Sequence, residues 1–268
     1  MKTRVLSGLI MLPLLVIVIL NGWVLFAGCF VLSIMAVFEF YRGFKELAIK
    51  PSFPIAIGSA VLLYLIGFLG HYGSHCEYFA SRDWMMLWVF ASMLACLLYL
   101  FKINERKLED SMVTAVGIFY VIFFCYHLAM IGMSEFSIFV WLVVITAFGT
   151  DICAYFAGVC LGKHKLCPVI SPKKTWEGAI GGVLGSVILC GIFAVIFARP
   201  YILHCLIIGV LGSVISMFGD LTASVFKRKM GIKDYGNLIP GHGGILDRFD
   251  SILFTAPLVF YYIMLVIM

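Results

Sequence analysis

The sequence predicts an all-α integral membrane protein of about nine transmembrane helices, with the N-terminus in the cytoplasm and the C-terminus outside. The 268 residues are 63% hydrophobic and only 12% charged, whereas soluble domains carry roughly a quarter charged residues. Apolar stretches of about 20 residues, the length of a helix that crosses the hydrocarbon layer, recur along the whole chain. Lys and Arg gather in alternate connecting segments, which is typical of short cytoplasmic loops.

Nine apolar windows are long enough to cross a membrane. They cover residues 5–20, 23–41, 52–72, 84–101, 111–131, 136–160, 178–198, 201–222 and 251–268. Only Asn21 and Gly22 separate the first two windows. We expect a tight helical hairpin there, because one continuous helix over both windows would be far too long for a bilayer. So many spans also argue against a cleavable signal peptide followed by a soluble domain.

The basic residues set the expected orientation. With the N-terminus inside, every Lys and Arg except Arg82 and Arg199 falls in a cytoplasmic segment. The formal net charge of +5 is therefore expected on the cytoplasmic face, where it favours anionic lipid head groups or anionic substrates. The loops are too short for a nucleic-acid platform, so we expect no nucleic-acid partner.

The charges also divide the chain into two predicted regions. Residues 1–110 contain four spans whose interiors are nearly free of charge, which favours a scaffold or a lipid-facing role. Residues 111–268 contain five spans, and from residue 136 onward acidic and basic groups lie within or against them. Because ionisable residues at membrane depth are costly and usually mark function, we expect residues 111–268 to be the catalytic region.

Asp151 lies well inside the sixth apolar window. A carboxylate at that depth costs a few kcal/mol unless it is compensated. It therefore needs a basic partner, a metal ion or water, and it is a candidate for a functional cavity that opens toward the cytoplasm. A buried Asp that hydrogen-bonds to a neighbouring helix is the structural alternative.

The segment SPKKTWEG, residues 171–178, enters the seventh window. Ser171 and Pro172 fit a helix start, because Pro is tolerated at the first helical position. Two lysines in the first turn would oppose the helix macrodipole, unless an anion lies among them and the free amide groups. The segment therefore predicts a phosphate site, with a positive-inside membrane anchor as the alternative. The residues expected there are Lys173, Lys174, Thr175 and Glu177.

Two further polar segments flank the end of the eighth window. If that helix continues to Gly231, one face carries an acid, a hydroxyl group and two bases, since residues three or four apart are neighbours on a helix. These residues are Asp220, Ser224, Lys227 and Arg228. The next segment, residues 233–250, reads KDYGNLIPGHGGILDRFD. Its glycines allow close backbone approach to a ligand and can offer amide groups to phosphate oxygens.

Asp247 and Asp250 share a face if the last helix has begun at that point. Carboxylates beside phosphate-binding cations are the surroundings that Mg²⁺ uses, because it binds through one or two carboxylates together with substrate phosphates. A network of acids and bases that only neutralise one another is the alternative. His242 lies within residues 240–244, which we call the glycine loop, as a possible donor to a phosphate.

Residues 224–250, which we call the signature segment, resemble the signature of the phosphatidate cytidylyltransferases, also called CDP-diglyceride synthases. The matching residues are Ser224, Lys227, Arg228, Lys233, Asp234, Gly236, Pro240, His242, Gly243, Gly244, Asp247, Arg248 and Asp250. SPKKTWEG is similar to a second segment of that family, so the resemblance covers the whole chain. It implies transfer of the cytidylyl group of CTP to phosphatidic acid, which forms CDP-diacylglycerol and pyrophosphate and requires Mg²⁺.

The resemblance and the residue chemistry together suggest roles. Asp220, Asp247 and Asp250 would hold Mg²⁺, with Asp151 as an outer neighbour or as a ligand of a second cation. The expected catalytic residues are Asp220, Asp247, Asp250, Lys227, Arg228 and Arg248. The expected substrate-binding residues are Lys173, Lys174, Thr175, Glu177, Ser224, Lys233, Asp234, His242, Gly243 and Gly244.

Other functions stay open on the residues alone. A metal-dependent polyprenyl-phosphate transferase would use similar acids, and a secondary transporter would place charges in broken helices. We expect a bacterial cell membrane, surrounding lipids as partners, and an active site that faces the cytoplasm. Gly178, Gly182 and Gly185 allow close helix packing, either within the chain or in a homodimer.

Overall fold

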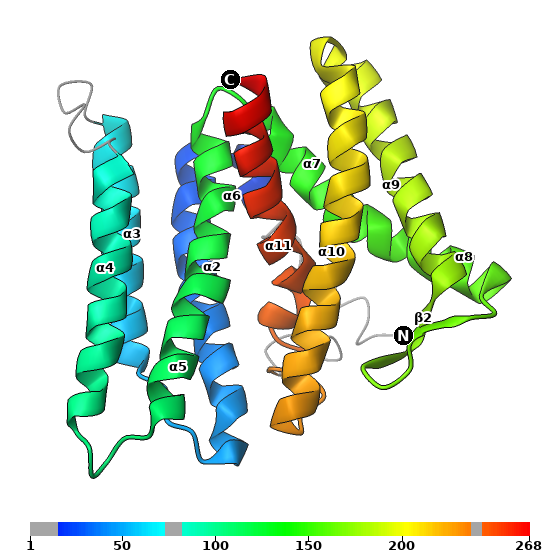
Figure 1. Cartoon of the computed structure of the whole chain (residues 1–268). Helices are drawn as coiled ribbons and strands as arrows, with labels where there is room; N and C mark the ends of the chain where they lie inside the picture. Colours follow the sequence, from blue (N-terminus) through cyan, green and yellow to red (C-terminus); the bar gives the residue numbers. More distant parts are fainter. Residues whose placement is uncertain (1–15, 73–81, 237–242) are drawn as a thin grey trace. The chain divides into compact units, whose positions relative to one another are not determined.

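The computed structural model describes residues 16–72, 82–236 and 243–268, and these residues are mostly helical (Figure 1). The chain divides into two compact units. The first comprises Met1–Met133 and Met230–Asp247, and the second comprises Ser134–Lys229 and Arg248–Met268. The boundary near residue 110 that the charges suggest concerns functional roles, and it stays a prediction.

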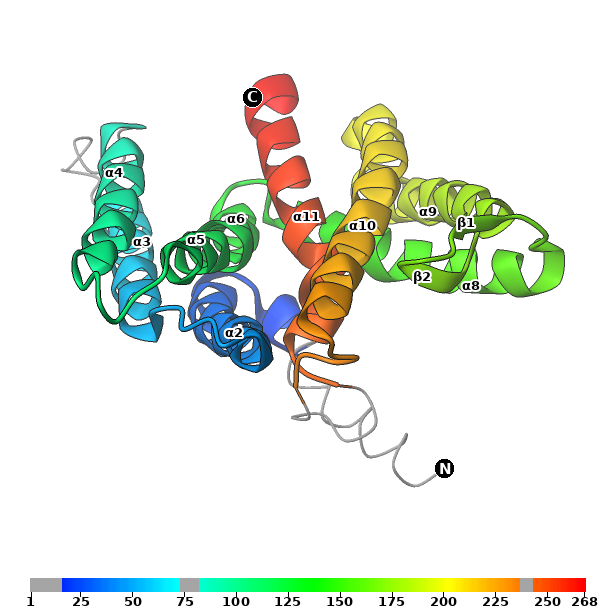
Figure 2. The same cartoon turned by 60° about the horizontal axis from the view of Figure 1, so that its bottom comes forward.

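The first unit consists of helices that pack in antiparallel pairs, and α2 lies against α6 while α3 lies against α4 (Figure 1 and Figure 2). Its core contains large side chains such as Phe40 and Trp88, both fully buried. The long helices are α2 (Gly22–Gly43), α3 (Phe53–Tyr72), α4 (Arg82–Leu98), α5 (Leu108–Val116) and α6 (Phe124–Met133). The short ones are η1 (Phe44–Leu47), η2 (Tyr99–Phe101) and η3 (Gly117–Phe123).

The second unit combines helices with one short hairpin of two antiparallel strands. Its first part contains η4 (Ser137–Phe139), α7 (Val140–Val144), η5 (Ile145–Gly149), α8 (Thr150–Leu161), β1 (Lys165–Cys167) and β2 (Ser171–Thr175). Its remaining elements are α9 (Trp176–Phe197), η6 (Arg199–Tyr201), α10 (Ile202–Met230), α11 (Leu246–Tyr262) and η7 (Ile263–Ile267). The first residues of α11 and the last residue of α10 belong to the first unit.

Within the described residues, eight helices are long and apolar enough to cross a membrane. They are Gly22–Leu47, Phe53–Gly70, Trp84–Phe101, Leu108–Met133, Ser137–Leu161, Trp176–Phe197, Arg199–Met230 and Leu246–Ile267. These helices correspond to the last eight predicted windows. The predicted first window, residues 5–20, lies mostly outside the described residues, so the total of nine and the orientation of the termini stay predictions. The predicted break falls at Asn21 and Gly22, where φ is 49° and 52°.

Small residues bring α8 and α9 together inside the second unit, and Figure 2 shows the two helices side by side. A Cβ atom on Gly178 would lie 2.8 Å from the carbonyl oxygen of Ala154, and one on Gly182 would lie 3.0 Å from the Cβ of Ala154. Gly185 faces Cys153 in the same way. These glycines therefore serve packing within the chain, because a side chain at any of them would separate the two helices.

The entry to α9 differs from the sequence prediction. Residues 171–175 form strand β2, which pairs with β1, and the helix begins only at Trp176. The helix start predicted at Ser171 and Pro172 is therefore wrong. Thr175 caps the helix instead, because its Oγ1 accepts a hydrogen bond from the backbone amide of Gly178 at 3.1 Å. A threonine hydroxyl satisfies a free amide of the first turn, whereas proline only tolerates the position.

We expect Thr175→Ala to lower the free energy of unfolding by about 1 kcal/mol, because the amide of Gly178 loses its acceptor. The site is nearly dry, since Thr175 is only 7% exposed. Thermal unfolding of purified protein in detergent measures the effect as a lower melting midpoint. Thr175→Ser keeps the hydroxyl group and is the matched control. Equal midpoints for the Ala and Ser variants would contradict the capping role.

A buried carboxylate starts α5 in the first unit. Asp110 is 2% exposed, and each of its oxygens accepts one backbone amide: Oδ1 from Lys50 at 2.7 Å and Oδ2 from Lys107 at 3.0 Å. These bonds join the loop after α2 to the start of α5. Asp110 lies in neither predicted site segment, and its two oxygens bind backbone amides of the first unit.

Candidate active site

Three carboxylates interact with one another in the second unit, and each comes from a different helix. Asp151 lies in the first turn of α8, Asp220 in α10 and Asp250 in α11. The charge of Asp220 acts on both of the others, and Asp151 also acts on Asp250. Like charges repel, so basic groups nearby stabilise this arrangement.

Lysine 174 supplies one of these cations from strand β2. Its ammonium group forms an ion pair with the Asp220 carboxylate, and the two side chains are 24% and 27% exposed. Because Lys174 is on a strand, the macrodipole argument made for a helical first turn does not apply to it. The ion pair nevertheless brings together two residues that are 46 positions apart and that the sequence assigns to one site.

Two more bases act on the outer carboxylates. Lys227 of α10 interacts electrostatically with Asp250, and Arg248 of α11 interacts with Asp151. Each carboxylate of the cluster therefore has a cation of the second unit that favours its ionised form. Within this unit the predicted acids and bases act on one another, and their assignment to one site stays a prediction.

A cavity of about 460 Å³ adjoins Asp151 and Lys174. Its volume lies within the range of small-molecule sites, which measure roughly 300 to 1,000 Å³. Its lining combines lysines and hydroxyl groups, which suit phosphate oxygens, with apolar side chains. Its lining residues include Asp151, Tyr155, Val159, Lys165, Ser171, Lys173, Lys174, Thr175 and Met217.

Helix α10 extends over 29 residues, so Asp220, Ser224 and Lys227 lie on one continuous helix as predicted. It ends before Gly231, whose φ of 72° is easily adopted only by glycine. Arg228 is exposed, and its Nε donates to the carbonyl oxygen of Ile170 at 3.5 Å. This weak bond links the end of the helix to the β1–β2 turn.

Glu177 has a structural task that the sequence prediction did not include. Its carboxylate accepts the backbone amides of Lys163 at 3.1 Å and of His164 at 3.2 Å, and its Oε1 lies 2.6 Å from Nδ1 of His164. These bonds fasten the turn after α8 to the first turn of α9. Most of the hydrogen-bonding capacity of Glu177 is therefore used within the protein.

The described residues of the glycine loop lie in the first unit, and Asp247 organises them. Asp247 is 8% exposed, and its Oδ2 accepts backbone amides from Tyr235 at 2.8 Å and from Gly244 at 2.9 Å. One carboxylate oxygen therefore binds Tyr235 and Gly244, which are nine positions apart in the chain. Gly243 has a φ of 84°, and a Cβ there would lie 2.8 Å from the same oxygen.

Sequence reasoning missed Glu39, a buried carboxylate of α2. It is 8% exposed, its Oε1 accepts the amide of Ile245 at 3.1 Å, and its Oε2 accepts the amide of Leu246 at 2.9 Å. The available signal was an acid inside an apolar window, the same feature that singles out Asp151. Glu39 is an exception to the expectation that the spans of residues 1–110 are nearly free of charge.

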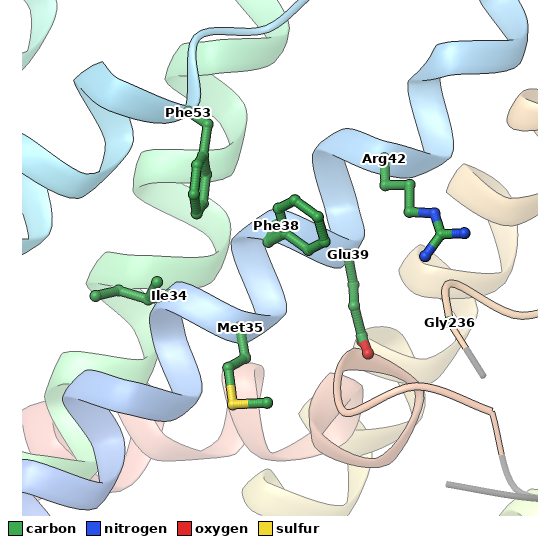
Figure 3. A pocket seen from close by; sticks show the side chains of 7 residues that line it. All are labelled: Ile34, Met35, Phe38, Glu39, Arg42, Phe53 and Gly236. Carbon is green, nitrogen blue, oxygen red and sulfur yellow. The ribbon is translucent and has the colours of Figure 1, made fainter. Parts of the chain in front are cut away.

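A second cavity, of about 570 Å³, adjoins Glu39 in the first unit (Figure 3). In Figure 3 the Glu39 side chain extends from α2 toward the chain segment that contains Gly236. Arg42 lies on the next turn of the same helix, and apolar side chains form the rest of the wall. The lining residues are Ile34, Met35, Phe38, Glu39, Arg42, Phe53 and Gly236.

The sequence matches the model of the cytidylyltransferase family over residues 2–266. The chain belongs to this family. Its relatives include proteins named phosphatidate cytidylyltransferase. The Bacillus subtilis protein is 32% identical over 97% of both chains. The Synechocystis protein is 48% identical over 131 residues, which are 47% of this chain and 44% of that protein. The Haemophilus influenzae protein is 43% identical over 125 residues, which are 45% and 43% of the two chains.

The remaining predicted site residues of this cytidylyltransferase-family protein differ in their exposure to solvent and in their hydrogen bonds. Lys173, Lys233 and Asp234 are exposed, whereas Ser224 is half-buried. The amide of Gly244 donates to Asp247 and is therefore not open to a phosphate. His242 lies outside the described residues.

The donor set suits a magnesium ion chemically, because it consists of carboxylate oxygens that repel one another and attract cations. Among the described residues, no group of three or more His, Cys, Asp or Glu side chains is arranged as a metal site. Mg²⁺ does not require such a group, since it usually binds one or two carboxylates together with substrate phosphates and water.

Proposed function

We propose that this chain is a phosphatidate cytidylyltransferase, which transfers the cytidylyl group of CTP to phosphatidic acid and forms CDP-diacylglycerol and pyrophosphate. The observation that carries this function is the full-length similarity to the Bacillus subtilis enzyme of that name. The family match favours it over a polyprenyl-phosphate transferase and over a secondary transporter, which the residues alone left open.

The reaction needs no base to create a nucleophile. An oxygen of the phosphatidate phosphate is already anionic, and it forms a bond to the α-phosphorus of CTP. The bond from that phosphorus to the oxygen that bridges to the β-phosphate breaks, and its electron pair leaves with pyrophosphate. The main obstacle is repulsion between two highly negative groups. Cationic side chains are therefore needed to offset this negative charge in the transition state.

The lysine-rich cavity of the second unit is our proposed site for the triphosphate of CTP. Lys165, Lys173 and Lys174 line it, and a point charge on a flexible stem suits phosphate groups. Lys227, Arg228 and Arg248, together with Lys233, offset the charge of the lipid phosphate and of the leaving pyrophosphate. Lys174 also neutralises Asp220, so it links the phosphate site to the carboxylate cluster.

We propose Asp220, Asp247 and Asp250 as the residues that hold Mg²⁺, with Asp151 as a neighbour or as a ligand of a second cation. When bound, the ion would neutralise charge on the reacting phosphates. Asp247 and Asp250 are three residues apart within α11, so they lie on neighbouring turns of one helix. The hydrogen bonds that Asp247 accepts orient its carboxylate, as outer hydrogen bonds do for metal ligands generally.

The spans and the family place the chain in a membrane as an integral protein. We propose the bacterial cell membrane, with the active site toward the cytoplasm, where CTP is made and where most basic residues are expected. Phosphatidic acid then reaches the site from the surrounding lipid. A homodimer stays a prediction, since the glycines that suggested it pack α8 against α9.

Incubation of the detergent-purified protein with phosphatidic acid, Mg²⁺ and CTP labelled at the α-phosphorus should produce labelled lipid. CTP labelled at the γ-phosphorus should leave the lipid unlabelled, because only the cytidylyl group is transferred. EDTA should reduce labelling to background and excess Mg²⁺ should restore it. Labelled lipid from the γ-label, or no lipid product from folded protein, would refute the proposed function. Full labelling in EDTA would refute the metal requirement.

A further inference from the structure

We propose that Glu39 is a positioning residue for cytidylyl transfer: it holds the start of α11 and the base of the glycine loop, and thereby sets the orientation of Asp247. This inference rests on the proposed function. It concerns a residue outside both segments that the sequence singled out, on a helix that was expected to act as a scaffold. Its supports are hydrogen bonding, burial and close contacts within the first unit.

Backbone amides compensate the buried charge of Glu39. Glu39 lies near the end of α2 and is almost inaccessible to water, so its carboxylate must be compensated by protein groups. Each of its two oxygens accepts one backbone amide, from Ile245 and from Leu246. Hydrogen bonds to an ionised acceptor are stronger than neutral ones, so these two bonds define the position of that backbone.

The two amides that Glu39 binds lie at the start of α11. The N-terminal amides of a helix have no partner within the helix, and the helix dipole favours a negative charge beside them. Helix α11 begins at Leu246, whose amide is bound by Glu39. Just before the helix, Glu39 also binds the amide of Ile245 and Asp247 binds the amide of Gly244. The described start of α11 is thus anchored by the protein's own acids.

Two glycines leave space for the Glu39 carboxylate. A Cβ atom on Gly236 would lie 2.7 Å from Oε1 of Glu39, and a Cβ on Gly244 would also collide with this carboxylate. These glycines precede and follow residues 237–242. The backbone on both sides of that segment therefore contacts the same side chain, which only glycine permits at this distance.

Glu39 is coupled to Asp247 through the chain itself. Ile245 and Leu246 immediately precede Asp247, whose Oδ2 in turn holds Tyr235 and Gly244. Any shift of the backbone at residues 245–246 therefore changes the direction of the Asp247 carboxylate. Misplacement of a reacting arrangement by about 1 Å can reduce the rate by roughly 100-fold. The expected consequence of losing Glu39 is thus kinetic.

The test compares Glu39→Gln with two matched variants. Gln fills the same volume, but it loses the charge and presents an amide donor to one of the backbone amides. We expect kcat to fall by roughly 100-fold, with KM for CTP little changed, since ground-state contacts to CTP are not removed. Apparent Mg²⁺ affinity should fall by about 10-fold or more, as it does when a hydrogen-bonding neighbour of a ligand is lost.

Asp110→Asn is the control for a structural carboxylate. Asp110 is also buried and also binds two backbone amides, but it contacts no residue of the signature segment in the described bonds. It should lower the melting midpoint at least as much as Glu39→Gln does while leaving kcat of the folded fraction unchanged. Glu46→Gln, an exposed position after α2, controls for the change in net charge and should match the wild type throughout.

Hydrogen exchange measured by mass spectrometry provides a readout independent of activity. Glu39→Gln should accelerate exchange in a peptide that covers residues 243–249 and leave a peptide from α9 unchanged. Gly236→Ala approaches the same contact from the other side and should show the same pattern with a smaller loss of kcat. It also serves as the decisive variant if Glu39→Gln does not fold.

Folded Glu39→Gln or, in its place, folded Gly236→Ala with wild-type kcat would overturn the proposal. So would a loss of kcat that Asp110→Asn reproduces, because a general loss of stability then explains it. If neither Glu39→Gln nor Gly236→Ala folds, Glu39 is required for folding, and this result would likewise overturn the positioning role. If the wild type itself makes no labelled lipid, the proposed function fails, whereas the exchange data still decide whether Glu39 holds residues 245–246.

Discussion

Asp247→Asn should reduce kcat for CDP-diacylglycerol formation by roughly 100- to 1,000-fold while the protein stays folded, as expected when a group that stabilises transition-state charge is removed. Asparagine retains an oxygen that can accept the amides of Tyr235 and Gly244, so these two hydrogen bonds can persist. The substitution removes the negative charge, which strengthens the binding of a hard divalent cation. Activity and structure should therefore separate at this position.

The measurement is steady-state transfer from labelled CTP, together with the melting midpoint in detergent. Glu105→Gln removes one negative charge from an exposed position of the first unit and should retain wild-type values for both. A higher Mg²⁺ concentration should restore part of the activity of Asp247→Asn if the lost charge served the metal. Near-normal turnover of this variant would remove Asp247 from the proposed metal site.

Asp220→Asn should cause a loss of kcat of similar size, again roughly 100- to 1,000-fold. Asp220 is the centre of the carboxylate cluster, since it acts on Asp151 and Asp250 and forms the ion pair with Lys174. Loss of its charge relieves repulsion from the other two acids but leaves Lys174 without its partner. These effects oppose each other, so the melting midpoint should change little.

The same variant tests the alternative that acids and bases only neutralise one another. In that case Asp220→Asn would change stability and leave the kcat of folded protein near the wild-type value. The double variant Asp220→Asn with Lys174→Met removes both charges of the ion pair. It should recover any stability lost through the unpaired lysine but none of the activity, because the carboxylate itself is needed. Glu135→Gln, an exposed acid of the second unit, is the charge control.

Local patterns predicted the helices well. Hydropathy located the last eight spans, because a helix in lipid satisfies its own backbone and needs only a long apolar stretch. The spacing of Asp220, Ser224 and Lys227 placed them correctly on one helix, since three- and four-residue intervals define a helical face. The prediction at Pro172 was wrong because the capping threonine and the pairing of β2 with β1 outweighed a permissive local signal.

The candidate site likewise combines features that local patterns predicted with features that they did not. The motif of residues 224–250 identified the family and with it the reaction, because the identity and order of these residues are properties of the chain alone. The partners that these residues contact in the folded protein are not determined by their order in the chain. Lys174 meets Asp220 across 46 positions, and Glu39 binds amides 206 and 207 positions away. Contacts of that separation depend on how helices pack, and no periodicity within one segment contains them.

The sequence by itself therefore determined the membrane class, the spans and the chemistry of the family, all of which follow from hydropathy and from residue types at short spacing. Only the tertiary structure decided which acids are already engaged by backbone amides, as Glu39, Asp110 and Glu177 are. The physical reason is that a carboxylate looks the same in the sequence whether it is compensated by a metal, by a lysine or by the end of a helix. Its surroundings, assembled from distant segments, decide which of these applies.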